Sequence, residues 1–139
     1  MIWQRAATVE QVNARLAGCM PGLLGIMITE IGPDYLAATM PVDQRHAQPF
    51  GVLHGGASVV LGETLGSAAC NLMQAEGFGS VGIEVNANHV ASVKVGQTLT
   101  AICRPIHTGR QIQVWQTEIR RADGKLASIC RLTCQVIPL

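Results

Sequence analysis

The stretch GGASVVLGETLGSAACNLMQAE, residues 55–76, decides the fold. One apolar stripe runs along it at the spacing of an α-helix, formed by Leu61, Leu65, Ala68 and Leu72. Gly77 and Gly79 follow the stretch, and glycines in this position typically end a helix. Residues 55–76 are therefore predicted to form one long helix.

The residues before this helix predict a short helix and two strands. Thr8 and Gln11 have the spacing of a capping box, which opens a helix over residues 9–16, and Gly18 and Pro21 are expected to end it. Strands are predicted at residues 25–31 and 35–42, with a turn between them, and residues 43–51 are predicted to be a loop.

The residues after the long helix predict four strands. Apolar residues alternate from Val81 to Ala87, the period of a half-buried strand, and further strands are predicted at residues 97–106, 111–120 and 125–137. This order predicts a single α+β domain over residues 1–139. Its curved, mostly antiparallel sheet of about six strands is expected to wrap around one long central helix.

Composition narrows the class of protein. Of the 139 residues 48% are apolar and only 14% are charged, against about 25% charged in ordinary soluble domains. Part of the apolar surface is therefore expected to be buried between copies of the chain, as a homo-oligomer. The formal net charge is +1 and no run of basic residues occurs, which argues against a nucleic-acid partner.

The sequence also indicates a cytoplasmic protein. No apolar stretch of a signal peptide follows the first residues, and no run of about 18 apolar residues could cross a membrane. The five cysteines are odd in number and lack metal-ligand spacing, which favours reduced, buried thiols. No membrane partner and no metal are expected.

The start of the long helix carries the first candidate site residues. Gly55 and Gly56 lack side chains, so a ligand can approach the helix N-terminus, where free N–H groups favour an anion or a developing oxyanion. Close packing is the alternative explanation of the two glycines. His54 is expected either to polarise a carbonyl or to hold the loop, and Gln48 to bind the substrate or an attacking water.

Glu63 is the second candidate site residue, and it stands alone as a charged residue in the middle of the long helix. It is the sole Asp, Glu, Lys or Arg between Arg45 and Glu76, and about 100° per residue places it opposite the apolar stripe, beside Ser67. It is expected either to be an ordinary solvated glutamate or to be a catalytic carboxylate shielded by a second surface. Gly62 and Gly66 flank it and are expected to allow close approach by a neighbouring backbone.

Helix geometry separates His54 from Glu63. Nine residues correspond to about 13.5 Å along the helix axis and to nearly opposite faces. If both residues serve one site, they must come from two copies of the helix related by a two-fold axis.

Asn88 and His89, at the end of a strand, are further candidates, whereas His46 and His107 are expected at the surface. The absence of Gly-x-Ser-x-Gly and P-loop motifs argues against a serine hydrolase or an NTPase.

The sequence resembles the hotdog-fold thioesterases. The residues that carry the resemblance are QPFGVLHGGAS (48–58), LGETLGS (61–67), EVNANH (84–89), MPVD (40–43), PIH (105–107) and the initial MIW. The branch is that of the phenylacetate-pathway thioesterase. Within it the sequence most resembles the enterobactin proofreading thioesterase and the dihydroxynaphthoyl-CoA thioesterase.

The resemblance implies a hotdog fold, a dimer with composite sites, and a homotetramer built as a dimer of dimers. It implies that Glu63 is the general base or nucleophile, assisted by Ser67, while Gln48, His54 and Gly55 act across the interface. The implied substrate is an aromatic acyl-CoA or acyl-carrier-protein thioester, of hydroxybenzoyl or dihydroxynaphthoyl type. No cofactor is implied, because coenzyme A is part of the substrate.

One departure affects the expected CoA contacts. Ala91 stands where relatives often carry Arg, so a contact to the nucleotide is expected from Lys94, Arg104 or Arg110 instead. The alternatives to hydrolysis are a hotdog protein that binds acyl-CoA without cleaving it, and a hotdog dehydratase or hydratase.

Overall fold

The computed structural model describes all residues, 1–139. The elements are α1 (Val9–Leu16), α2 (Met20–Leu23), β1 (Met27–Ile31), β2 (Leu36–Pro41), the 3-10 turn η1 (Gln44–His46), α3 (Gly55–Leu72), β3 (Phe78–His89), β4 (Thr98–Thr108), β5 (Ile112–Arg120) and β6 (Leu126–Pro138). The predicted long helix and six strands are confirmed. So is the capping box of α1, in which Thr8 and Gln11 cap each other.

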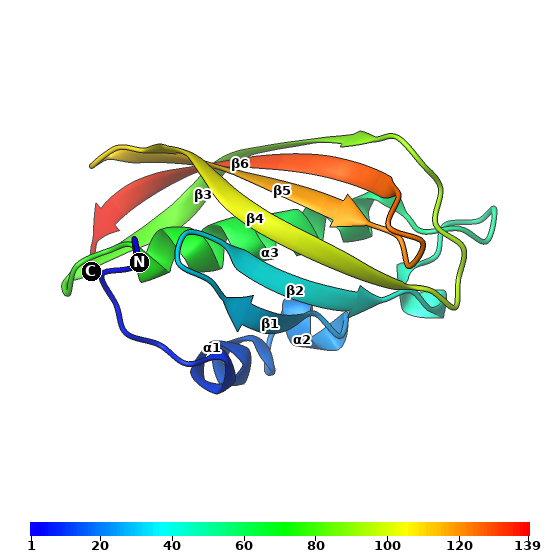
Figure 1. The fold of residues 1–139 in the computed structure, drawn as a ribbon, viewed down its shortest axis with the longest axis horizontal. Helices are drawn as coiled ribbons and strands as arrows, with labels where there is room; N and C mark the ends of the chain where they lie inside the picture. Colours follow the sequence, from blue (N-terminus) through cyan, green and yellow to red (C-terminus); the bar gives the residue numbers. More distant parts are fainter.

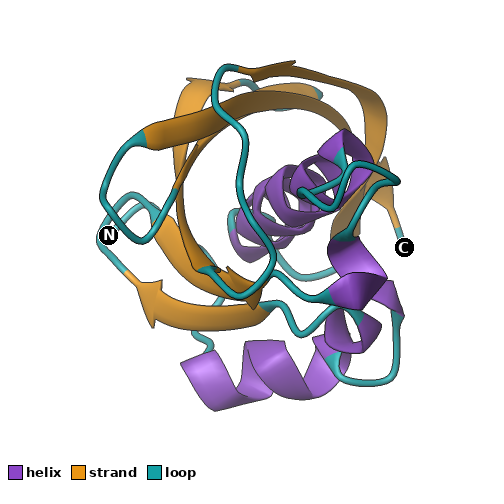
Figure 2. Ribbon diagram, turned by 90° about the vertical axis from the view of Figure 1, so that its right-hand side faces the viewer, coloured by secondary structure: helices purple, strands orange, loops and turns teal.

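The strands form one antiparallel sheet in the order β1-β2-β4-β5-β6-β3. The sheet curves around α3, which runs behind β2 and β4 in Figure 1, and α1 lies below this layer in Figure 2. This is the hotdog arrangement expected from the sequence. β1 and β3 are the two edges of the sheet, and β3 is by far the longer edge.

The core lies between the inner face of the sheet and α3. Leu61 and Leu65 of the apolar stripe are fully buried, as is Trp115 on β5. The strands alternate between buried and partly exposed residues, as in β5, because successive side chains point to opposite faces of a sheet. Ala68 of the predicted stripe is only half-buried, because it borders a cavity.

The long helix ends at Leu72, four residues before the predicted end. The Leu72 carbonyl accepts hydrogen bonds from the backbone N–H groups of Gln4 and Arg5, at 3.0 Å each. In a longer helix this carbonyl would instead accept from Glu76. The N-terminal segment therefore caps the helix from a distant part of the chain.

The short helix α2 was not predicted from the sequence. Pro21, expected to end α1, lies in the first turn of α2, where a missing N–H is tolerated. α2 turns the chain between α1 and β1, and its place beside α3 makes it a wall of the cavity described below.

The expectation for Gly62 and Gly66 is corrected by the structure. A Cβ on Gly62 would lie 2.5 Å from the Cβ of Cys130, and one on Gly66 would lie 2.8 Å from Leu132. Both neighbours belong to β6 of the same chain. The two glycines therefore allow α3 to approach its own sheet, not a neighbouring molecule.

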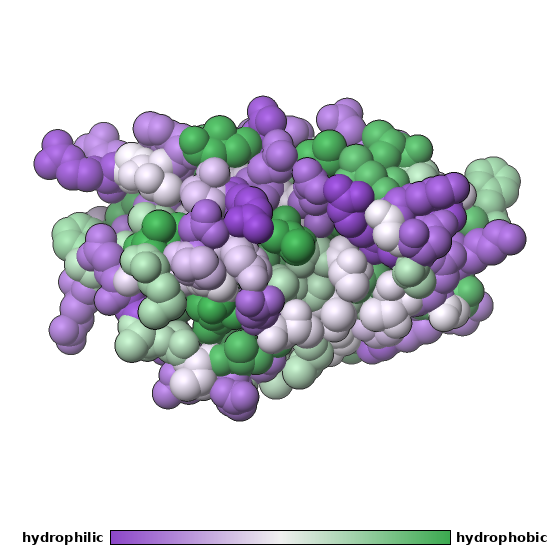
Figure 3. Space-filling view, viewed as in Figure 1, coloured by the Kyte–Doolittle hydropathy of each residue, from purple (hydrophilic) through white to green (hydrophobic).

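Apolar side chains also remain on the surface. Figure 3 shows the outer face of the sheet as a mosaic of hydrophobic patches between hydrophilic ones. Exposed isoleucines on β4 and β5 are Ile102, Ile106 and Ile112. The edge strand β3 exposes Val81 and Ile83, at 45% and 53% of their surface.

Candidate functional site

A cavity of about 510 Å³ lies between α3 and the pair α1–α2. Glu63, Thr64 and Ser67 border it from α3, so the two predicted residues Glu63 and Ser67 share one cavity. The other residues that line it are Arg5, Val12, Arg15, Leu16, Met20, Pro21, Val60, Ala68, Asn71 and Leu72. The walls are largely apolar, which suits the burial of an apolar or aromatic group.

Glu63 has no hydrogen-bond or ion-pair partner within the chain. Its side chain is exposed, and its Oε1 atom lies against β3, 3.1 Å from where a Cβ on Gly82 would be. Gly82 thus leaves room for the carboxylate at the edge of the sheet. In the single chain the carboxylate is free to bind a water or a substrate from the side of β3.

The N-terminus of α3 carries two unpaired donors. His54 is the N-cap, and its Nδ1 atom accepts a hydrogen bond of 2.8 Å from the Gly56 N–H. The accepting Nδ1 is unprotonated, so the neutral ring carries its proton on Nε2, which has no partner. The Gly55 N–H has no partner either. Two donors at a helix N-terminus can stabilise a developing oxyanion.

A second cavity, of about 350 Å³, adjoins this helix N-terminus. Gln48, Gly55 and His89 are the predicted site residues that line it. The others are Val52, Leu53, Ser58, Val90, Ala91, Ser92, Val93 and Ser128. The Gln48 Oε1 atom accepts from the Phe50 N–H, so the Gln48 amide group is held with its NH₂ available.

His89 links the second cavity to the end of β3. Its Nδ1 atom lies 3.0 Å from Ser128 Oγ, and its Nε2 atom lies 2.7 Å from where a Cβ on Gly55 would be. A side chain at position 55 would therefore collide with His89. This close approach, and not only access for a ligand, explains Gly55.

The remaining predicted contacts are scattered. Asn88 is exposed beside His89, and Lys94 is exposed and pairs through its backbone with Val52, next to the second cavity. Arg104 forms an ion pair of 3.0 Å with Asp34 and stacks on Tyr35, away from both cavities.

Arg110 borders a third cavity, of about 890 Å³, beside the C-terminal end of α3. Of the three basic candidates, only Lys94 therefore lies near the second cavity.

The structure does not bring all predicted site residues together. The cavity of Glu63 and Ser67 and the cavity of Gln48, Gly55 and His89 share no lining residue. α3 is continuous from Gly55 to Leu72, so the helix holds the two groups apart. This agrees with the separation calculated from the sequence.

Two parts of the site were missed in the sequence. The first is the α1–α2 wall, whose signal was Pro21 in a helix-starting position. The second is His46, which was expected at the surface but is 1% exposed. Its ring is buried because it binds Asp43 and the Leu24 carbonyl, 22 residues away in sequence.

The cysteines take no part in either cavity. All five are free, and Cys19 alone is exposed. Burial raises the pKa of Cys103 to about 12 and that of Cys130 to about 11. No group of three His, Cys, Asp or Glu side chains could hold a metal ion. No helix in the structure is both long enough and apolar enough to span a membrane.

Comparison with known families gives one clear match. Residues 50–128 match the family model described as the thioesterase superfamily. This range includes the α3 N-terminus, Glu63 and all of β3.

Full-length relatives agree with this match. A 1,4-dihydroxy-2-naphthoyl-CoA hydrolase of Escherichia coli is 49% identical, over 99% of this chain and 100% of that protein. The proofreading thioesterase EntH of Cronobacter sakazakii is 46% identical, over 99% of each chain. Both are hydrolases, which favours hydrolysis over the binding and dehydratase alternatives.

Solved structures confirm the hotdog architecture. A thioesterase from Haemophilus influenzae superposes with a TM-score of 0.96 at 48% identity, covering 100% of this chain and 96% of the other. A mutant thioesterase from Pseudomonas aeruginosa gives the same TM-score at 44% identity, with both chains fully covered.

Proposed function

Because the chain belongs to the thioesterase superfamily and is a thioester hydrolase, we propose that it cleaves aromatic acyl thioesters in sites built from two copies of the chain. One observation carries the proposal. The unpaired carboxylate of Glu63 borders the first cavity, whereas Gly55 borders the second cavity and His54, with its own unpaired donor, precedes Gly55 as the N-cap of α3. One chain alone therefore presents two incomplete halves of a site.

The edge strand β3 supplies the means of joining the halves. It is long, its outer edge has no partner strand, and it exposes Val81 and Ile83, which favours pairing with a second strand. Gly82 lies against Glu63, and His89 lies against Gly55. Antiparallel pairing of two β3 strands, centred between Gly82 and His89, would place one chain's Gly55 end beside the other chain's Glu63.

In this site the two halves have distinct tasks. The thioester carbonyl lies between the Gly55 N–H and the His54 Nε2–H, which stabilise the oxyanion as a tetrahedral intermediate forms. Glu63 acts as general base on water, or attacks the carbonyl itself. Collapse of the intermediate breaks the C–S bond, and the leaving thiolate takes up the proton that water gave to Glu63. If Glu63 itself attacked, the acyl group is left on it as a mixed anhydride, which water then hydrolyses to the free acid and the carboxylate while the thiolate is protonated. Ser67, one turn from Glu63, hydrogen-bonds to the acyl group or the water.

The cavity beside Glu63 is the proposed acyl pocket. Its volume and apolar walls suit an aromatic acyl group of hydroxybenzoyl or dihydroxynaphthoyl size. The cavity beside Gly55, bordered by Gln48 and His89, takes the pantetheine arm of CoA or of a carrier protein. The Gly56 N–H is occupied by His54, so Gly56 contributes its small size and not a donor.

We further propose a dimer of two such dimers in the cytoplasm. The isoleucines on the outer face of the sheet, Ile102, Ile106 and Ile112, are exposed in the single chain and would be covered by a second dimer.

The decisive experiment is Glu63→Gln, assayed by thiol release from benzoyl-CoA. We expect the variant to lose at least about 10³-fold in kcat, since the reaction loses its base or nucleophile, and to keep its fold. Unchanged hydrolysis by a variant with the same circular dichroism spectrum would refute the assignment of Glu63. Glu76→Gln, an exposed glutamate beyond the end of α3, is the matched control and should leave turnover unchanged.

A further inference from the structure

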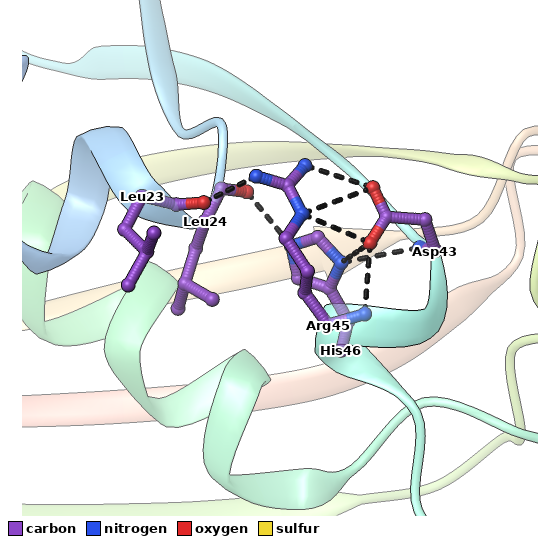
Figure 4. A network of polar contacts seen from close by, with 5 residues as sticks. All are labelled: Leu23, Leu24, Asp43, Arg45 and His46. Carbon is purple, nitrogen blue, oxygen red and sulfur yellow. Dashed lines mark hydrogen bonds and ion pairs between the residues drawn. The ribbon is translucent and has the colours of Figure 1, made fainter.

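A polar network joins the end of α2 to the turn η1 (Figure 4). The Arg45 guanidinium binds both Asp43 carboxylate oxygens and donates to the Leu23 carbonyl. His46, buried behind it, binds Asp43 on one side and the Leu24 carbonyl on the other. Two adjacent carbonyls, of the last residue of α2 and of its C-cap Leu24, are thus held by two adjacent residues of η1.

The two nitrogens of the His46 ring make different contacts. Nε2 lies 2.7 Å from the Leu24 carbonyl oxygen, which can only accept, so Nε2 carries the proton. Nδ1 then accepts from the Asp43 backbone N–H at 3.1 Å, and it also lies 3.1 Å from the Asp43 Oδ1 atom. The first contact is long-range and holds α2. The second is local and closes the η1 turn.

The two ends of this network lie at functional positions. On one side, Met20 and Pro21 of α2 are walls of the cavity that contains Glu63. On the other side, the His46 carbonyl accepts a 2.7 Å hydrogen bond from the His54 N–H. His46 therefore fixes the base of the loop that carries Gln48 and ends at His54.

We infer that His46 is a positioning residue for thioester hydrolysis, which holds the α2 wall of the acyl pocket and the loop of Gln48 and His54 at a fixed separation. The inference rests on the proposed function of both cavities. In the proposed dimer the loop serves the partner's carboxylate, whereas α2 borders the pocket of its own Glu63. The network therefore connects parts of the two sites of one dimer.

Two substitutions separate the two contacts. An Asn amide replaces the Nδ1 position of His, and a Gln amide replaces the Nε2 position. His46→Asn keeps an acceptor for the Asp43 N–H and loses the bond to Leu24, so α2 is released. His46→Gln keeps a donor for the Leu24 carbonyl and loses the closure of η1, so the loop is released.

The assay compares benzoyl-CoA, which fills the acyl pocket, with acetyl-CoA, which leaves it largely empty. For His46→Asn we expect kcat/KM to fall by about tenfold for benzoyl-CoA and by less than about twofold for acetyl-CoA. For His46→Gln we expect kcat to fall by about tenfold for both substrates alike, because the thioester-holding loop serves both. His107→Asn, an exposed histidine on β4, should change neither value.

A purely structural role would lower the melting temperature of both variants and leave the benzoyl-CoA to acetyl-CoA ratio of His46→Asn at the wild-type value, and that result would overturn the inference. If the buried variants fail to fold, Arg45→Met tests the same connection from the surface, by removing the bond to the Leu23 carbonyl. It should lower the benzoyl-CoA to acetyl-CoA ratio, and an unchanged ratio refutes the role. Glu63→Gln, measured in parallel, shows separately whether the proposed function holds.

Discussion

His54 caps the helix that carries Glu63, but the two residues lie at different places along it. His54 caps the start of α3 beside the second cavity, with Nδ1 bound to the Gly56 N–H. Glu63 lies two turns further on, in the cavity formed with α1 and α2. A rigid helix cannot bring the two side chains to one substrate atom, so a site that uses both requires a second chain.

Mixed dimers test this requirement directly. In a dimer of one Glu63→Ala chain and one His54→Ala chain, one site combines the intact Glu63 with the intact His54, and the other site lacks both. Random mixing gives mixed dimers in half of the population, so about a quarter of wild-type activity should return. Thiol release from benzoyl-CoA, measured after co-expression or after unfolding and refolding of the mixture, gives the answer. If the sites lie within one chain, the mixture will be no more active than its two components.

The CoA contact is expected at Lys94. Lys94 adjoins the second cavity, whereas Arg104 is paired with Asp34, and Arg110 lies at the other end of α3. Lys94→Ala should raise KM for benzoyl-CoA by about three- to tenfold with kcat unchanged, because it removes binding that ground and transition states share.

The same Lys94 variant should treat the N-acetylcysteamine thioester, which has no nucleotide, as the wild type does. Arg110→Ala is the matched control. A larger effect from Arg110 than from Lys94 would contradict the assignment.

The elements with local signals were the ones predictable from the sequence. The capping box of Thr8 and Gln11, the alternation from Val81 to Ala87 and the apolar stripe of α3 depend on neighbouring residues alone. Glu63 stood out because no other Asp, Glu, Lys or Arg surrounds it in the helix.

The features that were missed depend on distant contacts. α3 ends at Leu72 because the backbone of Gln4 and Arg5 caps it. His46 is buried because Leu24 offers a carbonyl to its ring. No periodicity or motif near either residue carries this information. The basic candidates Arg104 and Arg110 could not be sorted from Lys94 for the same reason.

Gly62→Ala should destabilise the protein although alanine favours helices. The added Cβ would lie 2.5 Å from the Cβ of Cys130, on the backbone-proximal part of a β6 side chain that cannot rotate away. Overpacking costs about 1–3 kcal/mol. It outweighs the gain of about 1 kcal/mol in helix propensity over glycine. Thermal unfolding should show a melting temperature lowered by a few degrees.

Gly18→Ala is the control for Gly62, because a Cβ there meets nothing within 4 Å. It should leave the melting temperature nearly unchanged. A Gly62 variant more stable than the wild type would show that α3 and β6 are less closely packed than described.

The cysteines should differ sharply in reactivity. Cys19 is exposed, whereas the other four are buried, and burial raises the pKa of Cys103 to about 12. The neighbouring Cys134 thiol lowers the pKa of Cys70 to about 7, but Cys70 is inaccessible to reagent. At pH ~8, where a free thiol reacts readily, one thiol per native chain should therefore react with Ellman's reagent.

Cys19→Ser should remove this reaction and leave thioesterase activity unchanged. All remaining thiols should become reactive in denaturant. Rapid reaction of a second thiol in the native protein would contradict the burial of the cysteines on α3, β4 and β6.

The Asp43–Arg45 pair should add acid-sensitive stability. Hydrogen bonds from the Arg45 side chain and backbone N–H hold the pKa of the Asp43 carboxyl well below its usual value. As the pH falls, Asp43 therefore binds a proton at a higher pH in the unfolded chain than in the native chain. Between the unfolded and the native pKa, unfolding takes up a proton. The stabilisation is fully present above the ordinary pKa of about 3.9, and it is lost as the pH falls through the lower native value.

Asn at position 43 can still cap η1 but carries no charge. The melting temperature of Asp43→Asn should accordingly fall furthest below that of the wild type at neutral pH, and the two curves should converge below pH ~4. Arg45→Met, which leaves the carboxylate without its partner, should flatten the same part of the wild-type curve. A constant difference between wild type and Asp43→Asn from pH ~7 to ~2 would show that the carboxylate charge does not stabilise the native state.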